Sequence, residues 1–237
     1  MGLFVILMGV QGAGKGEQAK YIHEHYGIPH VSTGDLFRAM RQREDALARR
    51  VQQIMAEGRL VDDDTTNEVV KDRLAEPDAA RGVIFDGYPR TPAQAQWLDA
   101  HLASRGEQIG TVIMLELDLY TAFKRAFGRI SSSKTGKSYN IYYNEAGIRW
   151  RFVDDPSNTF PPRLEAYLED GEPLVRRPDD ANAHAIIKRI DTYLATTQPL
   201  LDYYGQKGLL QRIDADQTIE TVSRAIHACL ETVRARG

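Results

Sequence analysis

A glycine-rich stretch near the N-terminus has the residue types that bind phosphate. In "GVQGAGKGEQ", residues 9–18, four glycines surround Lys15. Glycine lets backbone N–H groups turn inward around phosphate oxygens, and the lysine ammonium can reach the terminal phosphates. The apolar run 3–8 precedes the stretch, and residues 16–26 after it have a helical pattern. Strand, GxxxxGK and helix in this order predict a phosphate-binding loop, to which the helix N-terminus adds partial positive charge.

The end of this loop departs from the usual pattern. Ser or Thr commonly follows the lysine, but here Gly16 follows it and Glu17 comes next. A carboxylate about 4 Å from a phosphate charge costs on the order of 4 kcal/mol at an effective dielectric near 20. The first turn of a helix nevertheless favours a negative charge. We therefore expect Glu17 to point outward, with activity reduced but not abolished.

Three further segments carry charge and turn residues that suit phosphate binding. They are "STGDLFR" (32–38), "DGYPRTPAQAQ" (86–96) and "RRPDD" (176–180) with the later Arg189. The first two segments follow short apolar runs that are predicted to be strands. Because parallel sheets bind ligands at the carboxyl ends of their strands, we expect these segments to converge on the loop.

The alternation of apolar runs with longer amphipathic stretches predicts an α/β fold. Continuous apolar runs suit strands buried on both faces, hence a parallel five-stranded sheet flanked by helices. Gly27 is a plausible end for the first helix, and Asp216 or Thr218 a cap for the last. Residues 34–56 are expected to form helical pieces. The predicted strands are 3–8, 30–32, 82–86, 111–117 and 209–214.

Residues 130–177 interrupt this alternation with a long polar insert. "SSSKTGKSYNIYYN" (131–144) predicts a hairpin with "KTGK" as its turn, and "DDPSNTFPPRLEAY" (154–167) a loop followed by a short helix. Inserts of this kind are usually functional or mobile. A passive surface excursion is the alternative, and composition does not decide between them.

Composition and charge exclude several classes of protein. The 237 residues carry a net charge of −3, whereas nucleic-acid binders usually have a basic excess. Cys229 is the only cysteine, so no disulfide forms within the chain and no zinc site is built from cysteines. The six histidines show no HExxH pattern. The apolar N-terminal run is too short to span a bilayer. We expect a cytoplasmic protein without nucleic-acid or membrane partners.

Together, GxxGxGKG, STGDLxR, DGYPRTxxQA and the Arg–Asp pattern resemble the adenylate kinases of the nucleoside monophosphate kinase family. The resemblance covers essentially the whole chain. It implies a P-loop kinase core of residues 1–31, 62–129 and 178–237, an AMP-binding insert at 32–61 and a long lid at 130–177. The implied reaction is reversible transfer of a phosphoryl group from Mg-ATP to AMP, giving two ADP, with the lid closing over the site. The family is mostly monomeric.

The resemblance also implies a set of site residues. Asp86 would hold Mg²⁺ through water, and Lys188 is an alternative to Arg189 because the spacing is one residue longer than usual. Arginines suit the chemistry because phosphoryl transfer needs alignment and charge neutralisation. The catalytic set is Lys15, Arg38, Arg90, Arg129, Arg177 and Arg189. The ATP set is Gly12, Ala13, Gly14, Lys15, Gly16, Glu17, Arg125, Arg129, Ser138, Tyr139 and Gln217. The AMP set is Thr33, Arg38, Arg59, Leu60, Val61, Gly87, Tyr88, Pro89, Arg90, Gln94, Arg177 and Arg189.

The chain departs from the family pattern in two further places. Gln11 stands where proline is usual, and the lid lacks the cysteines that hold a structural zinc, so no zinc is expected. An apolar cluster of Trp150, Phe152, Tyr142 and Tyr143 is expected in its place. Two alternatives stay open: a UMP/CMP kinase or GTP:AMP phosphotransferase on the same fold, and a non-catalytic nucleotide-binding module if Glu17 disables the loop. Gln94 favours AMP as acceptor.

Overall fold

The computed structural model describes residues 2–57, 61–154, 163–176, 180 and 182–235. The chain divides into two compact units. The first unit comprises Met1–Gly9, Gly14–Glu116 and Thr196–Gly237, and the second comprises Val10–Ala13 and Leu117–Ala195.

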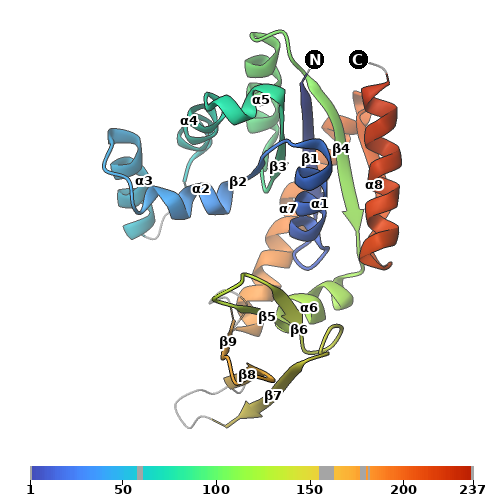
Figure 1. Cartoon of the computed structure of the whole chain (residues 1–237). Helices are drawn as coiled ribbons and strands as arrows, with labels where there is room; N and C mark the ends of the chain where they lie inside the picture. Colours follow the sequence, from blue (N-terminus) through green and yellow to red (C-terminus); the bar gives the residue numbers. More distant parts are fainter. Residues whose placement is uncertain (1, 58–60, 155–162, 177–179, 181, 236–237) are drawn as a thin grey trace. The chain divides into compact units, whose positions relative to one another are not determined.

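A parallel five-stranded sheet forms the core of the first unit (Figure 1). Its central strand, β1, is almost completely buried, with Phe4 to Leu7 at most 1% exposed. A continuous apolar run is typical of a strand that is buried on both faces of a parallel sheet. The predicted α/β fold with a parallel five-stranded sheet is confirmed. In sheet order the strands are β10 (Leu210–Asp214), β4 (Ile109–Glu116), β1 (Leu3–Gly9), β3 (Gly82–Asp86) and β2 (His30–Ser32).

Two helices pack side by side against this sheet, α1 (Lys15–Tyr26) and α8 (Ile219–Arg234) (Figure 1). Helix α1 ends, as predicted, at Gly27, whose φ of 66° places it in the left-handed region and whose N–H bonds the His23 carbonyl. Thr218, rather than Asp216, caps α8 by accepting a hydrogen bond from the Thr221 N–H. The caps therefore set where both helices begin or end.

The remaining helices of the first unit carry the segments between the strands. The predicted helical pieces of 34–56 are confirmed as α2 (Thr33–Met40) and α3 (Ala46–Ala56). Together with α4 (Asp63–Leu74) they enclose a small apolar core that includes Met40, Val51 and Val69. A 3₁₀ turn (Pro77–Arg81) leads into β3, α5 (Pro92–Ala103) follows β3, and the long helix α7 (Ala183–Gln206) enters this unit at Thr196.

The second unit combines helix α6 (Leu119–Phe127) and the first part of α7 with two small antiparallel sheets. The predicted hairpin is confirmed as β5 (Arg129–Ser132) paired with β6 (Ser138–Asn140), and β9 (Leu174–Val175) joins β5. The other sheet pairs β7 (Ile148–Val153) with β8 (Arg163–Leu168).

The short helix predicted after the "DDPSNTFPP" loop is wrong, because Arg163–Leu168 forms strand β8. The register places Leu164 opposite Phe152 and Ala166 opposite Trp150. The apolar residues of this segment recur with a period of two, which suits a strand with one buried face. Pairing with β7, which the local pattern alone does not reveal, decides the conformation.

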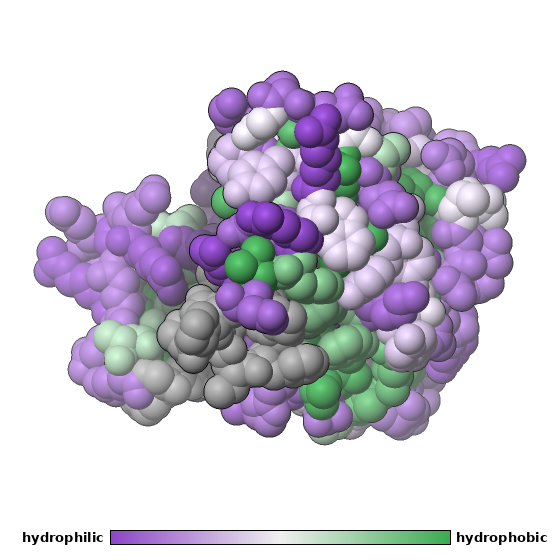
Figure 2. Space-filling view, turned by 90° about the horizontal axis from the view of Figure 1, so that it is seen from below, coloured by the Kyte–Doolittle hydropathy of each residue, from purple (hydrophilic) through white to green (hydrophobic). Residues whose placement is uncertain are grey.

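The expected aromatic cluster is also wrong in its composition. The buried core of the second unit is aliphatic, with Ile130, Ile141, Ala166 and Leu174 at its centre and Trp150 partly buried against it. Phe152, Tyr142 and Tyr143 are 38%, 40% and 49% exposed. The Lys124 ammonium lies 5.3 and 5.4 Å from the two tyrosine ring centroids, an arrangement that favours rings at the surface. Figure 2 shows pale ring-shaped side chains at the surface among purple polar ones.

Candidate functional site

The first part of the glycine loop, Val10–Ala13, turns tightly within the second unit. The Ala13 N–H donates to the Val10 carbonyl at 3.1 Å. Gly12 has a φ of 93°, and a Cβ there would lie 2.6 Å from the Ala122 carbonyl oxygen. Both observations require glycine at this position. The loop can therefore hold its backbone close to helix α6.

The second part of the loop begins helix α1 in the first unit. Gly14 is the N-cap, with a left-handed φ of 87°. The ammonium of Lys15, the first helical residue, folds back and donates to the Gly9 carbonyl at 2.7 Å. A helix N-terminus with a lysine ammonium beside it is a site for an anion.

Glu17 stands in the first turn of α1 and is exposed. Its carboxylate has no hydrogen bond or ion pair within the described ranges, and a Cβ added at Gly16 would meet nothing within 4 Å. The exposure of Glu17 is consistent with the outward orientation expected for its side chain.

Asp86 is the last residue of β3, where the sheet presents its carboxyl edge. The His30 Nε2 lies 3.2 Å from the Asp86 Oδ2. Burial raises the pKa of Asp86, but the hydrogen bond with His30 and the charges of Lys15 and Arg90 outweigh burial. The pKa therefore lies below its ordinary value, and Asp86 is ionised at neutral pH.

In the turn after β3, two predicted site residues donate hydrogen bonds to the same backbone carbonyl. Gly87, with a left-handed φ of 72°, accepts hydrogen bonds at its carbonyl from the Thr33 hydroxyl at 2.9 Å and the Arg90 Nε at 2.8 Å. The exposed Arg38, also in the first unit, pairs with Asp35 on α2. Two of the predicted acceptor-site residues, Thr33 and Arg90, thus donate to the carbonyl of a third, Gly87.

Gln94 lies in the first turn of α5 and is only 5% exposed. Its Oε1 accepts from the Arg90 backbone N–H at 2.7 Å, and its Nε2 donates to the Asp63 Oδ1 at 2.6 Å. Tyr88 is 1% exposed, and its hydroxyl donates to Asn67 at 2.6 Å. The Tyr88 ring is therefore part of the core, so this residue can meet a ligand through its backbone.

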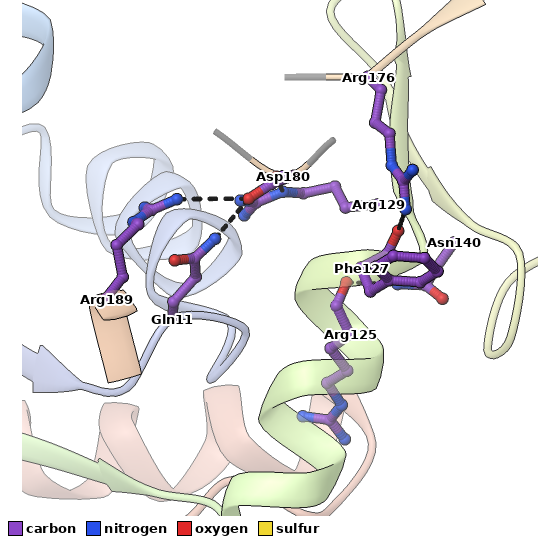
Figure 3. Close-up of polar contacts among 8 residues, drawn as sticks. All are labelled: Gln11, Arg125, Phe127, Arg129, Asn140, Arg176, Asp180 and Arg189. Carbon is purple, nitrogen blue, oxygen red and sulfur yellow. Dashed lines mark hydrogen bonds and ion pairs between the residues drawn. The ribbon is translucent and has the colours of Figure 1, made fainter. Parts of the chain in front are cut away.

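In the second unit, a carboxylate gathers two of the predicted catalytic arginines (Figure 3). Asp180 is fully buried, and its Oδ2 accepts from Arg129 Nε at 2.9 Å and Arg129 Nη2 at 2.6 Å. Its Oδ1 lies 3.4 Å from Arg189 Nη1 and also accepts from the side-chain amide of Gln11. Lys188, the alternative to Arg189, is exposed. The cluster fixes Arg129 and Arg189 as neighbours and ties both to the glycine loop.

The other residues predicted for the donor nucleotide are spread over both units. Arg125 on α6 lies with its guanidinium carbon 5.5 Å from the Tyr143 ring centroid. Ser138 and Tyr139 are on β6, and Gln217 donates to the Asp214 carboxylate at 2.8 Å before α8. Val61 packs beside the apolar core of α2 to α4. Arg59, Leu60 and Arg177, predicted for the acceptor or catalytic site, lie outside the described residues.

Several partners of the site residues were not predicted as such. His30, Asp63 and Asp180 each hold a predicted residue, and Gln11 was noted only as a departure from the family. The acidic pair that ends "RRPDD", one residue after two arginines, was the available signal for Asp180. Asp63 is one of three consecutive aspartates, and nothing in the local sequence distinguishes it.

The described residues contain neither a metal-binding group of side chains nor a membrane-spanning helix. Within the described ranges, no three His, Cys, Asp or Glu side chains group so as to hold a metal ion. No helix in the part of the chain that the structure describes has the length and apolar character to cross a membrane.

Comparison with known proteins gives matches over nearly the whole chain. The family model described as adenylate kinase matches residues 7–209. An adenylate kinase of Anaeromyxobacter sp. (strain Fw109-5) is 42% identical over 221 residues, covering 93% of this chain and 95% of that protein. An adenylate kinase of Shouchella clausii is 39% identical over 232 residues, covering 98% and 99%. An adenylate kinase of Moorella thermoacetica is 39% identical over 226 residues, covering 95% and 97%.

Proposed function

The chain belongs to the adenylate kinase family, and from that premise we propose how its residues divide the work of the reaction. It is an enzyme that transfers a phosphoryl group between ATP and AMP, giving two ADP. The family implies that ATP is used with Mg²⁺.

We propose that Gly12 to Glu17 wrap the phosphates of ATP, with Lys15 on the transferred group. The left-handed glycines and the start of α1 support this, because both direct backbone N–H groups toward an anion. Arg125 lies against the donor base, and Gln217 contacts that base from the other side. Ser138 and Tyr139 cover the nucleotide from the lid insert.

Asp86 is proposed to hold Mg²⁺ through water. An ionised carboxylate is a hard oxygen ligand, and the depressed pKa of Asp86 supplies one at neutral pH. The metal neutralises charge on the phosphate oxygens when bound. His30 orients the carboxylate by its contact with Oδ2.

AMP is proposed to bind in the first unit, between the α2 start and the turn after β3. Thr33, Arg38, Gly87 to Arg90 and Gln94 form this site, together with residues 59–61. The observation that supports it is the pair of bonds that converge on the Gly87 carbonyl from Thr33 and Arg90. Arg90 binds the AMP phosphate, and Gln94 recognises adenine.

Arg129, Arg177 and Arg189 are proposed to surround the phosphoryl group in transit. Guanidinium groups match phosphate oxygens with two parallel N–H groups, and they keep their charge at any working pH. The observation that carries this proposal is the convergence of Arg129 and Arg189 on the buried Asp180. A carboxylate in that position restrains both side chains before substrate arrives.

The three-part division of the chain is also a proposal: a core of 1–31, 62–129 and 178–237, an AMP-binding insert at 32–61 and a lid at 130–177. The lid closes over the nucleotides and excludes water, because water would otherwise accept the phosphoryl group. We further propose a cytoplasmic monomer with no nucleic-acid or membrane partner.

Nucleotide preference is tested with a panel of donors and acceptors. We propose ATP over GTP as donor, and AMP over UMP or CMP as acceptor, the latter because Gln94 suits adenine. A coupled assay of diphosphate formation with each pair decides the matter. A higher kcat/KM with UMP, CMP or GTP would identify a related transferase on the same fold.

Glu17→Thr is expected to increase the affinity for ATP. A threonine hydroxyl can donate to a phosphate oxygen, whereas a carboxylate can only accept, and it competes with phosphate for the helix N-terminus. The free protein should instead become slightly less stable, because the first turn of α1 loses a favourable charge worth roughly 0.3–1 kcal/mol. Calorimetry with a non-hydrolysable ATP analogue at two ionic strengths measures the two affinities, and screening should narrow the difference between them.

Glu24→Thr is the control for this measurement, because Glu24 is an exposed glutamate near the other end of α1. It should leave nucleotide affinity unchanged. Equal affinities of the wild type and the Glu17 variant would mean that the outward-pointing Glu17 carboxylate lies too far from the phosphates to weaken binding.

No stoichiometric zinc is expected, and a chelator should leave the melting temperature unchanged. Cys229, the only cysteine, lies on α8 in the first unit. In the second unit the buried Ser132 hydroxyl donates to Glu172 at 2.6 Å, and Lys134 lies 3.6 Å from the same carboxylate. A hydrogen bond and an ion pair thus join the turn between β5 and β6 to the segment between β8 and β9. Elemental analysis that finds one zinc per chain would contradict the proposal.

A further inference from the structure

The side-chain amide of Gln94 is held in one orientation by its two partners. The Arg90 backbone N–H lies 2.7 Å from Oε1, and the Asp63 carboxylate lies 2.6 Å from Nε2. A backbone N–H can only donate a hydrogen bond, and an ionised carboxylate can only accept one. If the amide were reversed, two donors would face each other at one end and two acceptors at the other. The oxygen and nitrogen of Gln94 therefore cannot exchange places.

Asp63 is itself anchored by the surrounding structure. It is the first residue of α4, where the helix N-terminus favours a negative charge. Its Oδ2 accepts from the Thr91 hydroxyl at 2.7 Å, and Thr91 is the N-cap of α5, the helix that carries Gln94. One carboxylate thus contacts both the cap of α5 and the amide in its first turn.

The bonds to Arg90 and Asp63 leave Gln94 with one N–H and one oxygen lone pair. Adenine presents a ring nitrogen that accepts beside an amino group that donates. A 6-oxopurine such as hypoxanthine or guanine presents a ring N–H that donates beside an oxygen that accepts. An amide that cannot rotate matches one of these edges and opposes the other. A free amide would match either edge by turning through half a rotation.

We propose that Asp63 is a positioning residue that sets the purine preference of the acceptor site by fixing the Gln94 amide. The proposal rests on the proposed contact of Gln94 with the acceptor base. Asp63 does not touch the substrate. Its effect is to make reversal of the amide costly, because reversal leaves buried polar groups without partners. The Gln94 amide therefore keeps the orientation that matches adenine when a 6-oxopurine enters, and the 6-oxopurine binds more weakly.

A purely structural role predicts a different result. Asp63 also joins α4 to α5, so its removal could lower stability alone. A structural defect would lower kcat/KM for AMP and for IMP to the same extent. A Gln94 amide that is free to rotate would instead lower kcat/KM for AMP and raise kcat/KM for IMP relative to that for AMP. The ratio of the two specificity constants separates the two roles.

The experiment measures kcat and KM for AMP and IMP, with ATP as donor, in four variants. Asp63→Ala should raise the KM for AMP about tenfold, lower the AMP/IMP ratio of kcat/KM at least tenfold and leave kcat for AMP close to wild type. Asp63→Asn should restore most of the preference, because its Oδ1 can accept from Gln94 while its Nδ2 faces Thr91. Asp64→Ala, the exposed neighbour in the same helical turn, should behave as wild type. Gln94→Ala should lose the preference.

Each outcome decides one statement. An unchanged AMP/IMP ratio in Asp63→Ala, beside a lost preference in Gln94→Ala, would overturn the role of Asp63 and leave the proposed role of Gln94 intact. A wild-type preference in Gln94→Ala would overturn the Gln94 contact itself. Equal losses for AMP and IMP in both Asp63 variants would assign Asp63 a structural role only.

Discussion

Replacing Lys15 by methionine is expected to lower turnover at least 100-fold while leaving the fold intact. The lysine ammonium is the one side-chain charge within the glycine loop that can follow the transferred phosphate. Removing a single preorganised donor from a transition state typically costs 10²–10³ in rate, and a donor that carries a full charge belongs at the upper end of this range. Methionine keeps the length and volume of the side chain but removes the charge.

The structure gives a reason to expect little change in stability. Lys15 is only partly buried, and its ammonium bonds the Gly9 carbonyl, which lies at the end of β1. Loss of one such bond changes the free energy of unfolding by about 1.5 kcal/mol, the lower end for a bond to a charged group, because the site is partly exposed. Steady-state kinetics and thermal melting by circular dichroism measure the two effects separately.

Lys20→Met is the matched control, because Lys20 is an exposed lysine of the same helix, 3.9 Å from Glu24. It should keep wild-type kinetics, since surface ion pairs of this kind contribute little. Turnover of the Lys15 variant within threefold of wild type would show that the glycine loop does not bind the transferred phosphate.

The parts of the molecule that local sequence determines were predictable. The core strands are continuous apolar runs, and burial on both faces leaves such a run few alternatives to a central strand. Gly27 and Thr218 end or begin helices because a left-handed glycine and a capping hydroxyl act on their immediate neighbours. The turn of the glycine loop was predictable for the same reason, since its conformation depends on glycines that are adjacent in the sequence.

What could not be predicted depends on partners distant in the sequence. Strand β8 forms because β7 lies beside it, and the local pattern of Arg163–Leu168 also allowed a helix. Gln11 and Asp180 are 169 positions apart, and Asp63 and Gln94 are 31 apart. Motifs identified the arginines and the glutamine but not the carboxylates that orient them, because a carboxylate becomes an anchor only through folding.

Asp180→Asn is expected to lower turnover about 100-fold and to destabilise the protein. The native carboxylate is fully buried and holds Arg129 and Arg189 by charge as well as by hydrogen bonds. Asparagine has nearly the same shape but no charge, so both guanidinium groups lose their counter-charge and part of their restraint. Misplacement of a positioning group by about 1 Å can cost about 100-fold in rate.

The effect on stability follows from the burial of the partners. Breaking a buried ion pair on one side costs about 3–5 kcal/mol. Arg129 and Arg189 keep 25% and 41% exposure of their side chains, so water solvates part of the released charge and the lower end applies. For a chain of this size, about 3 kcal/mol corresponds to a fall in melting temperature of roughly 6–12 °C.

A local rearrangement limits the damage in this variant. Gln11 donates its amide nitrogen to Asp180, while its own Oε1 is buried and has no hydrogen-bond partner among the described residues. If the Gln11 amide turned over, Oε1 would accept from the new asparagine amide. Asp180→Ala removes this option as well and should be less stable than Asp180→Asn.

Glu165→Gln provides the control in the same unit, because Glu165 also pairs with two arginines, Arg151 and Arg163. Those arginines are 74% and 59% exposed and have no proposed part in phosphoryl transfer, so turnover should stay at the wild-type level. Kinetics are measured well below the melting temperature of every variant, so that unfolding does not lower the rate. If Asp180→Asn and Glu165→Gln gave equal turnover, the carboxylate would serve the fold alone, and the two arginines would find their phosphate-binding geometry without it.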